Sequence, residues 1–245
     1  MSKKKKGKIH PWRLCPEGEH WVRAHPLHVP PSKKHPAGSV TIRHVHCANN
    51  PTGKDQLYPD EIQEIAKQNF SKVKNKPCPL TLPFPNGSKY DDLIAGWTQY
   101  WNDVFGPSES LDPNLIKALI ASESSFNPTL LTNKRDSNSA RGLMQITNKT
   151  RKILENELGE LKDHYLTITK NDLNDPNINI SAGIRWLFQK KLLASNRLGR
   201  PATCEEAVAE YKGVLKDFVA GKTQAKKLMD RFKKYFETLK QCGKV

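Results

Sequence analysis

The chain has 245 residues, enough for one sizeable domain and an appendage that together bury a substantial core. Its 40 Lys and Arg outnumber its 25 Asp and Glu, giving a formal net charge of +15, and its mean hydropathy is −0.69. This composition excludes a small disulfide-stapled peptide and predicts a soluble protein with an anionic partner. No stretch reaches the ~18 apolar residues that a membrane-crossing helix needs.

The N-terminal fifth of the chain differs in composition from the rest. Residues 1–50 carry +8 of the net charge and seven of the eight histidines. A Pro-rich stretch, HPLHVPPSKKHPAG, precedes VTIRHVHC, whose alternating pattern is typical of a strand. We therefore expect a small basic β-rich module over residues 1–50, followed by a helix and a Pro-rich linker over residues 51–89.

The five cysteines are odd in number and scattered, so a full disulfide framework is not expected. Two of them lie among the N-terminal histidines, and His/Cys sets bind zinc. Because no CxxC or HxxxH spacing accompanies them, solvated basic histidines on a small β module remain the competing interpretation, and we expect no other cofactor. The candidate zinc ligands are Cys15, His20, His44, His46 and Cys47.

The remainder of the chain is expected to be mainly helical. The segment DEIQEIAKQNF has a helical pattern, and apolar residues recur near helical spacing over residues 90–105. Asp112 followed by Pro113 marks a helix start, with the aspartate as N-cap and the proline where its missing N–H costs nothing. These patterns favour a helical domain over residues 90–245.

The helix that begins at Asp112 contains the most informative residue of the sequence. Its buried stripe is formed by Ile116, Leu119 and Ile120, and the stripe continues to Glu123. A carboxyl group on a buried stripe loses hydration and tends to keep its proton, which is the state that a general acid needs. In the alternative, the helix exposes Glu123 or a nearby Lys or Arg pairs with it. Periodicity alone leaves both interpretations open.

Three sequence blocks resemble those of a known family. They are ESSFNP at 123–128, ARGLMQIT at 140–147 and DPNINISAGIRWL at 175–187. Their order and spacing are similar to those of the soluble lytic transglycosylase (SLT) domain, a lysozyme-like family that cleaves the glycan strands of peptidoglycan. The resemblance implies a lysozyme-like helical fold for the C-terminal part of the chain.

The resemblance also implies roles for particular residues. Glu123 corresponds to the single catalytic acid/base of the family, and Ser124 to a residue that positions the substrate. Tyr211 in AEYKGV resembles the tyrosine of the family's Ala-Tyr-Asn-x-Gly motif, although Lys212 stands where that motif has asparagine. The second block implies further substrate contacts, a glycine that lets sugar approach the backbone and a glutamine with both donor and acceptor. These contacts are Gly142, Leu143, Met144 and Gln145.

The implied reaction needs only one carboxylate. It cleaves the β-1,4 bond between N-acetylmuramic acid (MurNAc) and N-acetylglucosamine (GlcNAc) and leaves a 1,6-anhydro-MurNAc end without consuming water. A hydrolytic muramidase of the goose-lysozyme type would need a second acid. Asp136 is the candidate for that acid, and Asp175 is a weaker one because helix capping accounts for it.

Two other classes of function compete with an enzyme. A non-catalytic wall-binding protein would use the same fold, and a nucleic-acid-binding protein would account for the charge. The latter lacks an accompanying recognition motif, so we expect no specific nucleic-acid partner. The charge of +15 also suits peptidoglycan, whose strands carry carboxylates.

The N-terminal residues lead to an expectation about delivery. The lysine run Lys3–Lys6 has no apolar stretch behind it, so we expect synthesis in the cytoplasm without a Sec signal. Action at the cell wall or in the periplasm would then require another route. A phage lysis or virion enzyme fits this expectation, as does an antibacterial secreted effector with a delivery machine and an immunity protein as partners.

Overall fold

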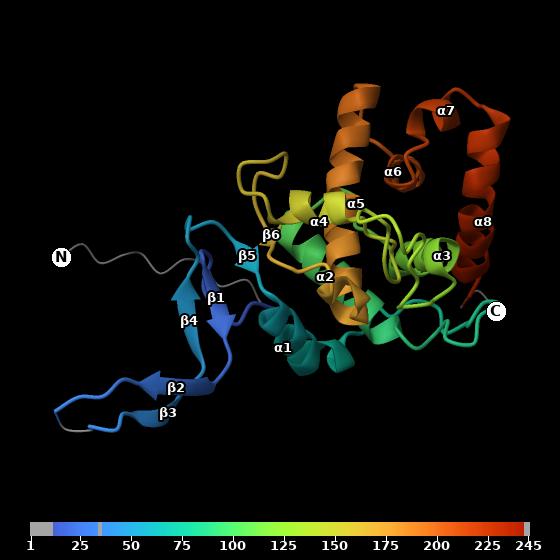
Figure 1. Ribbon diagram of the computed structural model, residues 1–245. Coiled ribbons are helices and arrows are strands. Elements are labelled where there is room, and N and C mark those ends of the chain that lie inside the picture. The colour runs from blue at the N-terminus through green and yellow to red at the C-terminus, as the bar shows by residue number, and fades with distance from the viewer. Residues whose placement is uncertain (1–11, 34–35, 243–245) are drawn as a thin grey trace.

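The computed structural model describes residues 12–33 and 36–242, and the run Lys3–Lys6 lies outside these ranges. A β-rich N-terminal part lies on one side of a larger helical body, and the last helix lies on the opposite side of that body (Figure 1). The expected fold class, a mainly α domain with a small β-rich N-terminal module, is confirmed.

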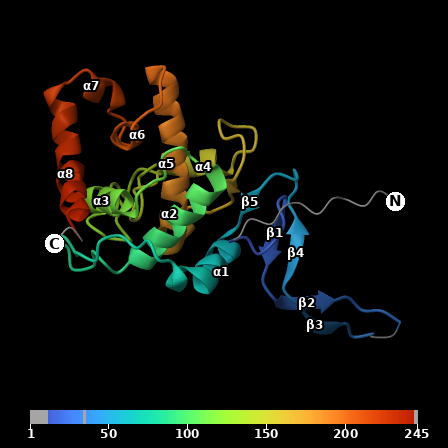
Figure 2. The same ribbon diagram turned by 180° about the vertical axis from the view of Figure 1, so that it is seen from behind.

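The N-terminal strands form one long, bent hairpin. The strands are β1 (Glu19–Val22), β2 (His25–Val29), β3 (Ser39–Arg43) and β4 (His46–Asn49). The same antiparallel register runs through both pairs, because Val22 lies opposite His46 and His25 lies opposite Arg43. The outer half, β2–β3, projects away from the body (Figures 1 and 2). The strand expected from VTIRHVHC is therefore present but is interrupted where the hairpin bends.

The body is built around one long central helix. Its helices are α1 (Pro59–Asn69), α2 (Asp91–Phe105), α3 (Pro113–Ser124), α4 (Asn148–Glu155), α5 (Pro176–Leu198), α6 (Cys204–Tyr211), α7 (Leu215–Val219) and α8 (Thr223–Lys240). Helix α5 packs against α1, α2, α4 and α6, whereas α3 packs against α2 and α8. The indole N–H of Trp97 donates to Asn177 Oδ1 at 2.6 Å, and that of Trp101 donates to the Ser181 carbonyl at 3.0 Å. These bonds fix α2 on α5.

Residues 51–89 contribute to the same core. Leu57, Ile62 and Phe70 are buried together with the apolar side chains of α2 and α3. The short strand β5 (Gln56–Leu57) pairs in parallel with β6 (Tyr165–Leu166), which lies more than 100 residues later. This pairing joins the segment before α1 to the helical body.

A buried network of charged groups connects the N-terminal module to the body. Arg13 pairs with Asp55, and its Nε donates to Glu61 Oε1 at 2.7 Å. His164 Nδ1 lies 2.8 Å from the second oxygen of Asp55. Arg13 Nη2 also donates to the Glu19 carbonyl at 2.7 Å. Buried charges are tolerated when they are paired and hydrogen-bonded in this way, and the network therefore holds the start of the module in place.

Two disulfides are present that the sequence did not predict. Cys15 is bonded to Cys47, Cys78 is bonded to Cys242, and Cys204 is free. The spacing of the cysteines does not indicate these pairs, because the partners lie 32 and 164 residues apart and are brought together by the fold. The first bond ties the start of the module to β4, and the second ties the loop before α2 to the end of α8.

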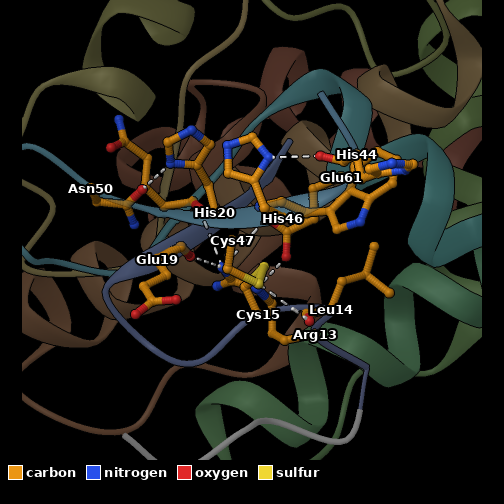
Figure 3. Close-up of a disulfide and its surroundings, with 12 residues drawn as sticks. Arg13, Leu14, Cys15, Glu19, His20, His44, His46, Cys47, Asn50 and Glu61 are labelled. Carbon is orange, nitrogen blue, oxygen red and sulfur yellow. Dashed lines mark hydrogen bonds and ion pairs between the residues drawn. A yellow bond between two sulfur atoms is a disulfide. The ribbon is translucent and has the colours of Figure 1, made fainter. Parts of the chain in front are cut away.

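Four of the five candidate zinc ligands, Cys15, His20, His46 and Cys47, have side chains engaged in other contacts (Figure 3). Cys15 and Cys47 are bonded to each other, so neither sulfur is a free thiolate, and this part of the predicted ligand set is corrected. The His20 ring shares a 2.8 Å hydrogen bond with the Asn50 side chain, and His46 contacts the His44 carbonyl at 3.0 Å. Within residues 12–33 and 36–242, no group of three His, Cys, Asp or Glu is arranged to hold a metal ion.

No helix in the described ranges combines the length and the apolar character that a membrane span requires.

Candidate active site

Helix α3 places Glu123 at its C-terminal end. The predicted cap is present, since Asp112 accepts a 2.8 Å hydrogen bond from the Asn114 N–H, and the apolar stripe behind Glu123 is fully buried. The helix ends in two consecutive left-handed residues, Ser125 (φ 53°) and Phe126 (φ 61°). The Phe126 side chain is buried in the core and stabilises this sharp ending, which leaves Glu123 in the last turn beside a cavity.

Glu123 is partly buried and ion-paired. Its side chain is 18% exposed and contacts the ammonium of Lys212, which is 13% exposed. The sequence left open whether Glu123 is a shielded acid or the partner of a nearby cation, and the structure has features of both. A cavity of about 380 Å³ opens beside the pair. It is lined by Ser122, Glu123, Lys212, Lys227, Leu228 and Arg231.

The loop that carries the second block is held rigidly behind this site. Gln145 adopts φ 50°, and its Nε2 donates to the Gly142 carbonyl at 2.8 Å while its Oε1 accepts from Thr132 Oγ1 at 2.7 Å. Leu143 and Met144 are completely buried, so their side chains pack in the core and do not reach the solvent side where a sugar would lie. The side chain of Gln145 is part-exposed and is the member of this set that faces outward.

Gly142 has a packing role that the sequence did not indicate. A Cβ atom at this position would collide with the Asn179 side chain and with the Leu173 carbonyl. Asn179, on α5, accepts from the Met144 N–H at 2.8 Å and donates to the Arg141 carbonyl at 3.0 Å. The glycine therefore allows α5 to approach the loop closely. This packing explains the glycine at position 142 without a contact to a sugar.

Tyr211 connects α6 to the same loop. Its hydroxyl donates to the Met144 carbonyl at 2.7 Å. Burial and the negative charge of Glu123 hold the pKa of Tyr211 well above its ordinary value, so the hydroxyl remains a donor. Tyr211 therefore lies within reach of the charge of Glu123 and contacts the second block, whereas neither Tyr211 nor residues 142–145 line the cavity beside Glu123.

Three other predicted residues lie elsewhere or act structurally. Ser124 is 4% exposed, and its hydroxyl donates back to the Ile120 carbonyl at 3.2 Å. Asp136 is exposed in a turn, where it accepts a 2.8 Å hydrogen bond from the Asn138 N–H. Asp175 caps α5 by accepting from the Ile178 N–H at 3.0 Å, as expected.

Comparison with known families agrees with this geometry. Residues 106–211 match the family described as the transglycosylase SLT domain. The chain contains a transglycosylase SLT domain. Among solved structures, the chain is similar to the 70 kDa soluble lytic transglycosylase of Escherichia coli, with 17% sequence identity and a TM-score of 0.32. The similarity covers 71% of this chain and 25% of that one, so this chain spans about a quarter of the length of that enzyme. No curated protein matches this chain.

The matched SLT domain ends at Tyr211, so part of the cavity is built by residues beyond it. Lys212 follows directly, and Lys227 and Arg231 come from α8. Arg231 Nη2 donates to Ser125 Oγ at 3.0 Å, which places α8 against the end of α3. Sequence reasoning missed the two α8 residues because their approach to Glu123 depends on tertiary packing over more than 100 residues of chain.

Proposed function

We propose that this chain is a peptidoglycan lytic transglycosylase and that Glu123 is its catalytic acid/base. The observation that carries the proposal is the position of Glu123, which lies part-buried at the edge of a cavity and close enough to Tyr211 for its charge to raise the pKa of that tyrosine. One positioned carboxyl group near an enclosed surface is the minimum that glycosidic-bond cleavage with acid and base assistance requires. The SLT domain supports the same reaction class.

The proposed reaction transfers two protons through Glu123, one in each step. Glu123 in its acid form protonates the oxygen that links MurNAc to GlcNAc, and the bond to the MurNAc C1 breaks. The substrate's own acetamido group stabilises the positive charge that develops at C1. Glu123, now a base, removes the proton of the MurNAc C6 hydroxyl, whose oxygen then bonds to C1. The products are GlcNAc with a free 4-hydroxyl and a 1,6-anhydro-MurNAc end, and Glu123 is protonated again.

The hydrolytic alternative receives less support. It requires a second carboxylate that activates water on the opposite face of the sugar. Asp136 lies in an exposed turn where its carboxylate already accepts a backbone hydrogen bond. Asp175 is committed to capping α5.

We also propose that the protein acts outside the reducing cytoplasm. Its two disulfides favour an oxidising compartment. The net charge of +15 suits the carboxylates of the wall.

The catalytic role of Glu123 is tested by Glu123→Gln. Release of soluble fragments from purified peptidoglycan should fall by at least about 100-fold, because the amide neither donates nor accepts the proton. The matched control is Glu109→Gln, which changes an exposed glutamate that does not line the cavity and should retain the wild-type rate. Full activity of Glu123→Gln would refute the assignment, and a wall-binding protein would show no release from either variant or from the wild type.

A further inference from the structure

The cavity beside Glu123 has an excess of positive charge. Ser122 and Glu123 come from α3, Lys212 follows α6, and Lys227 and Arg231 come from α8. Three cations therefore face one carboxylate around a space of about 380 Å³. A cleft lined by one sign of charge concentrates field lines and attracts ligands of the opposite sign.

The two cations of α8 are not neutralised by carboxylates in the described part of the chain. Lys227 is exposed and has no ion-pair partner there. Arg231 donates to the neutral hydroxyl of Ser125 at 3.0 Å, and its guanidinium lies 5.9 Å from the centre of the Tyr235 ring. The arginine is thereby oriented at the cavity wall. Like charges gathered in this way repel one another, and an anionic ligand would relieve that repulsion.

Lys212 has a different relation to the cavity because it is paired with Glu123. The ammonium of Lys212 contacts a carboxyl oxygen of Glu123 and so covers it. The first step of the proposed reaction needs that carboxyl group to face the glycosidic oxygen. The ion pair must therefore separate before a proton is transferred to the glycosidic oxygen, and a second carboxylate arriving in the cavity would compete for Lys212.

We propose that this cavity is a binding site for a carboxylate of the glycan substrate, held by Lys212, Lys227 and Arg231. Binding of that carboxylate draws Lys212 away from Glu123 and frees the Glu123 carboxyl group to face the glycosidic oxygen. This inference rests on the proposed function for the identity of the glycan. Lys212 is then a positioning residue that makes the acid available only when an anionic sugar chain is in place.

Two groups of peptidoglycan supply such a carboxylate. In strands stripped of peptide the lactyl group of MurNAc is free, whereas in intact strands the lactyl group is in amide linkage and the stem peptide carries the carboxylates. Both share the chemistry that the cavity recognises. Strands of each kind, together with stripped strands whose lactyl carboxylates have been converted to neutral amides, therefore distinguish the sources.

The test is a titration of the folded protein with these strands, in which calorimetry measures the affinity. The wild type should bind stripped strands about tenfold more tightly than the amidated strands, which corresponds to one charge-assisted contact. Lys212→Met and Lys227→Met should each remove most of this preference, while Lys212→Arg should keep it. Lys226→Met is the matched control, because Lys226 neighbours Lys227 on α8 but does not line the cavity.

The same titration with Glu123→Gln gives a second, opposite prediction. Since a neutral amide cannot retain Lys212 by ion pairing, this variant should bind the stripped strands a few-fold more tightly than the wild type does, and the amidated strands equally. A preference for intact over amidated strands would identify the stem peptide as the source. Equal affinity of the wild type for all three strands would overturn the inference. A retained preference without any cleavage product would overturn the proposed function and leave this site standing.

Discussion

Gly142 lies at a position beside the site where only a residue without a side chain fits. Its φ is +73°, and an added Cβ would meet the Leu173 carbonyl oxygen at 2.5 Å as well as the side chain of Asn179. Gly142→Ala should lower the free energy of unfolding by about 2–4 kcal/mol, because the methyl group displaces the asparagine that holds the Met144 N–H. Denaturant unfolding measures this, with glycan release as a second readout.

Gly199 provides the matched control for this prediction. It has φ +65° but nothing lies within 4 Å of an added Cβ. Gly199→Ala should therefore cost only about 1 kcal/mol from backbone strain. Equal losses of unfolding free energy in the two variants would show that crowding against α5 is not the reason for a glycine at position 142.

At this scale the sequence predicted part of the site. The spacing on α3 was sufficient to select Glu123 and to raise the alternative of a paired cation, because helical periodicity is local. Tyr211 and Gln145 were selected only through the family resemblance. Lys227 and Arg231 were not selected, since nothing in a single sequence relates α8 to the end of α3.

Helix α6 determines where Tyr211 and Lys212 lie, and its start is strongly fixed. Thr203 and Glu206 form a reciprocal capping box, and Arg200 binds Glu206 through two hydrogen bonds of 2.9 Å and 2.6 Å. Chiefly through these bonds from Arg200, the pKa of Glu206 is lowered from 4.5 to about 2. The ionised Glu206 side chain therefore stabilises the fold at pH values above the pKa that it has in the unfolded chain. That contribution is lost as the pH falls toward 2.

Glu206→Gln tests this capping. The variant should be less stable than the wild type by about 1 kcal/mol at neutral pH, since one half of the capping box and an ion pair are weakened. The difference should shrink when unfolding is measured near pH 3, because the wild-type carboxylate then begins to be protonated. A difference that stays constant over this pH range would contradict the assignment.

Among the elements, the helices were predicted better than the strands. The helices at Asp112 and Asp175 were identified by cap and proline signals that act within one turn. The N-terminal strand was recognised by its alternation, but the bend that divides it between β3 and β4 was not. That bend lies where the inner half of the hairpin is held by the Cys15–Cys47 bond and the outer half is unsupported.

The whole molecule is closed by the bond between Cys78 and Cys242, which spans 164 residues. Cys242→Ser should lower the stability by about 2–5 kcal/mol, because the unfolded chain gains the freedom that the crosslink removes. The binding of stripped glycan strands should weaken as well, since α8 carries Lys227 and Arg231. Thermal unfolding without reductant measures the first effect.

Cys204→Ser is the control for this crosslink because Cys204 is the free cysteine. It should change the stability far less than Cys242→Ser does. Similar midpoints for Cys242→Ser and the wild type would mean that the crosslink contributes little to the closed fold.

At the scale of the whole chain, the mainly helical class was predictable from periodicity and from the three blocks. The disulfides were not, because cysteine spacing gives no pairing when the partners lie far apart. The charge of +15 indicated an anionic partner without locating it. The structure concentrates part of that charge around Glu123, which connects the global composition to the proposed chemistry.

We expect one glutamate to cleave the glycan strand without water, and the masses of the products test this expectation most directly. Purified peptidoglycan should be digested with the wild type and with Glu123→Gln, and the soluble muropeptides analysed by mass spectrometry. The wild type should produce 1,6-anhydro-MurNAc ends, which are lighter by one water than hydrolytic fragments, and Glu123→Gln should not. Fragments with reducing ends, or anhydro ends formed equally by Glu123→Gln, would contradict the proposed reaction.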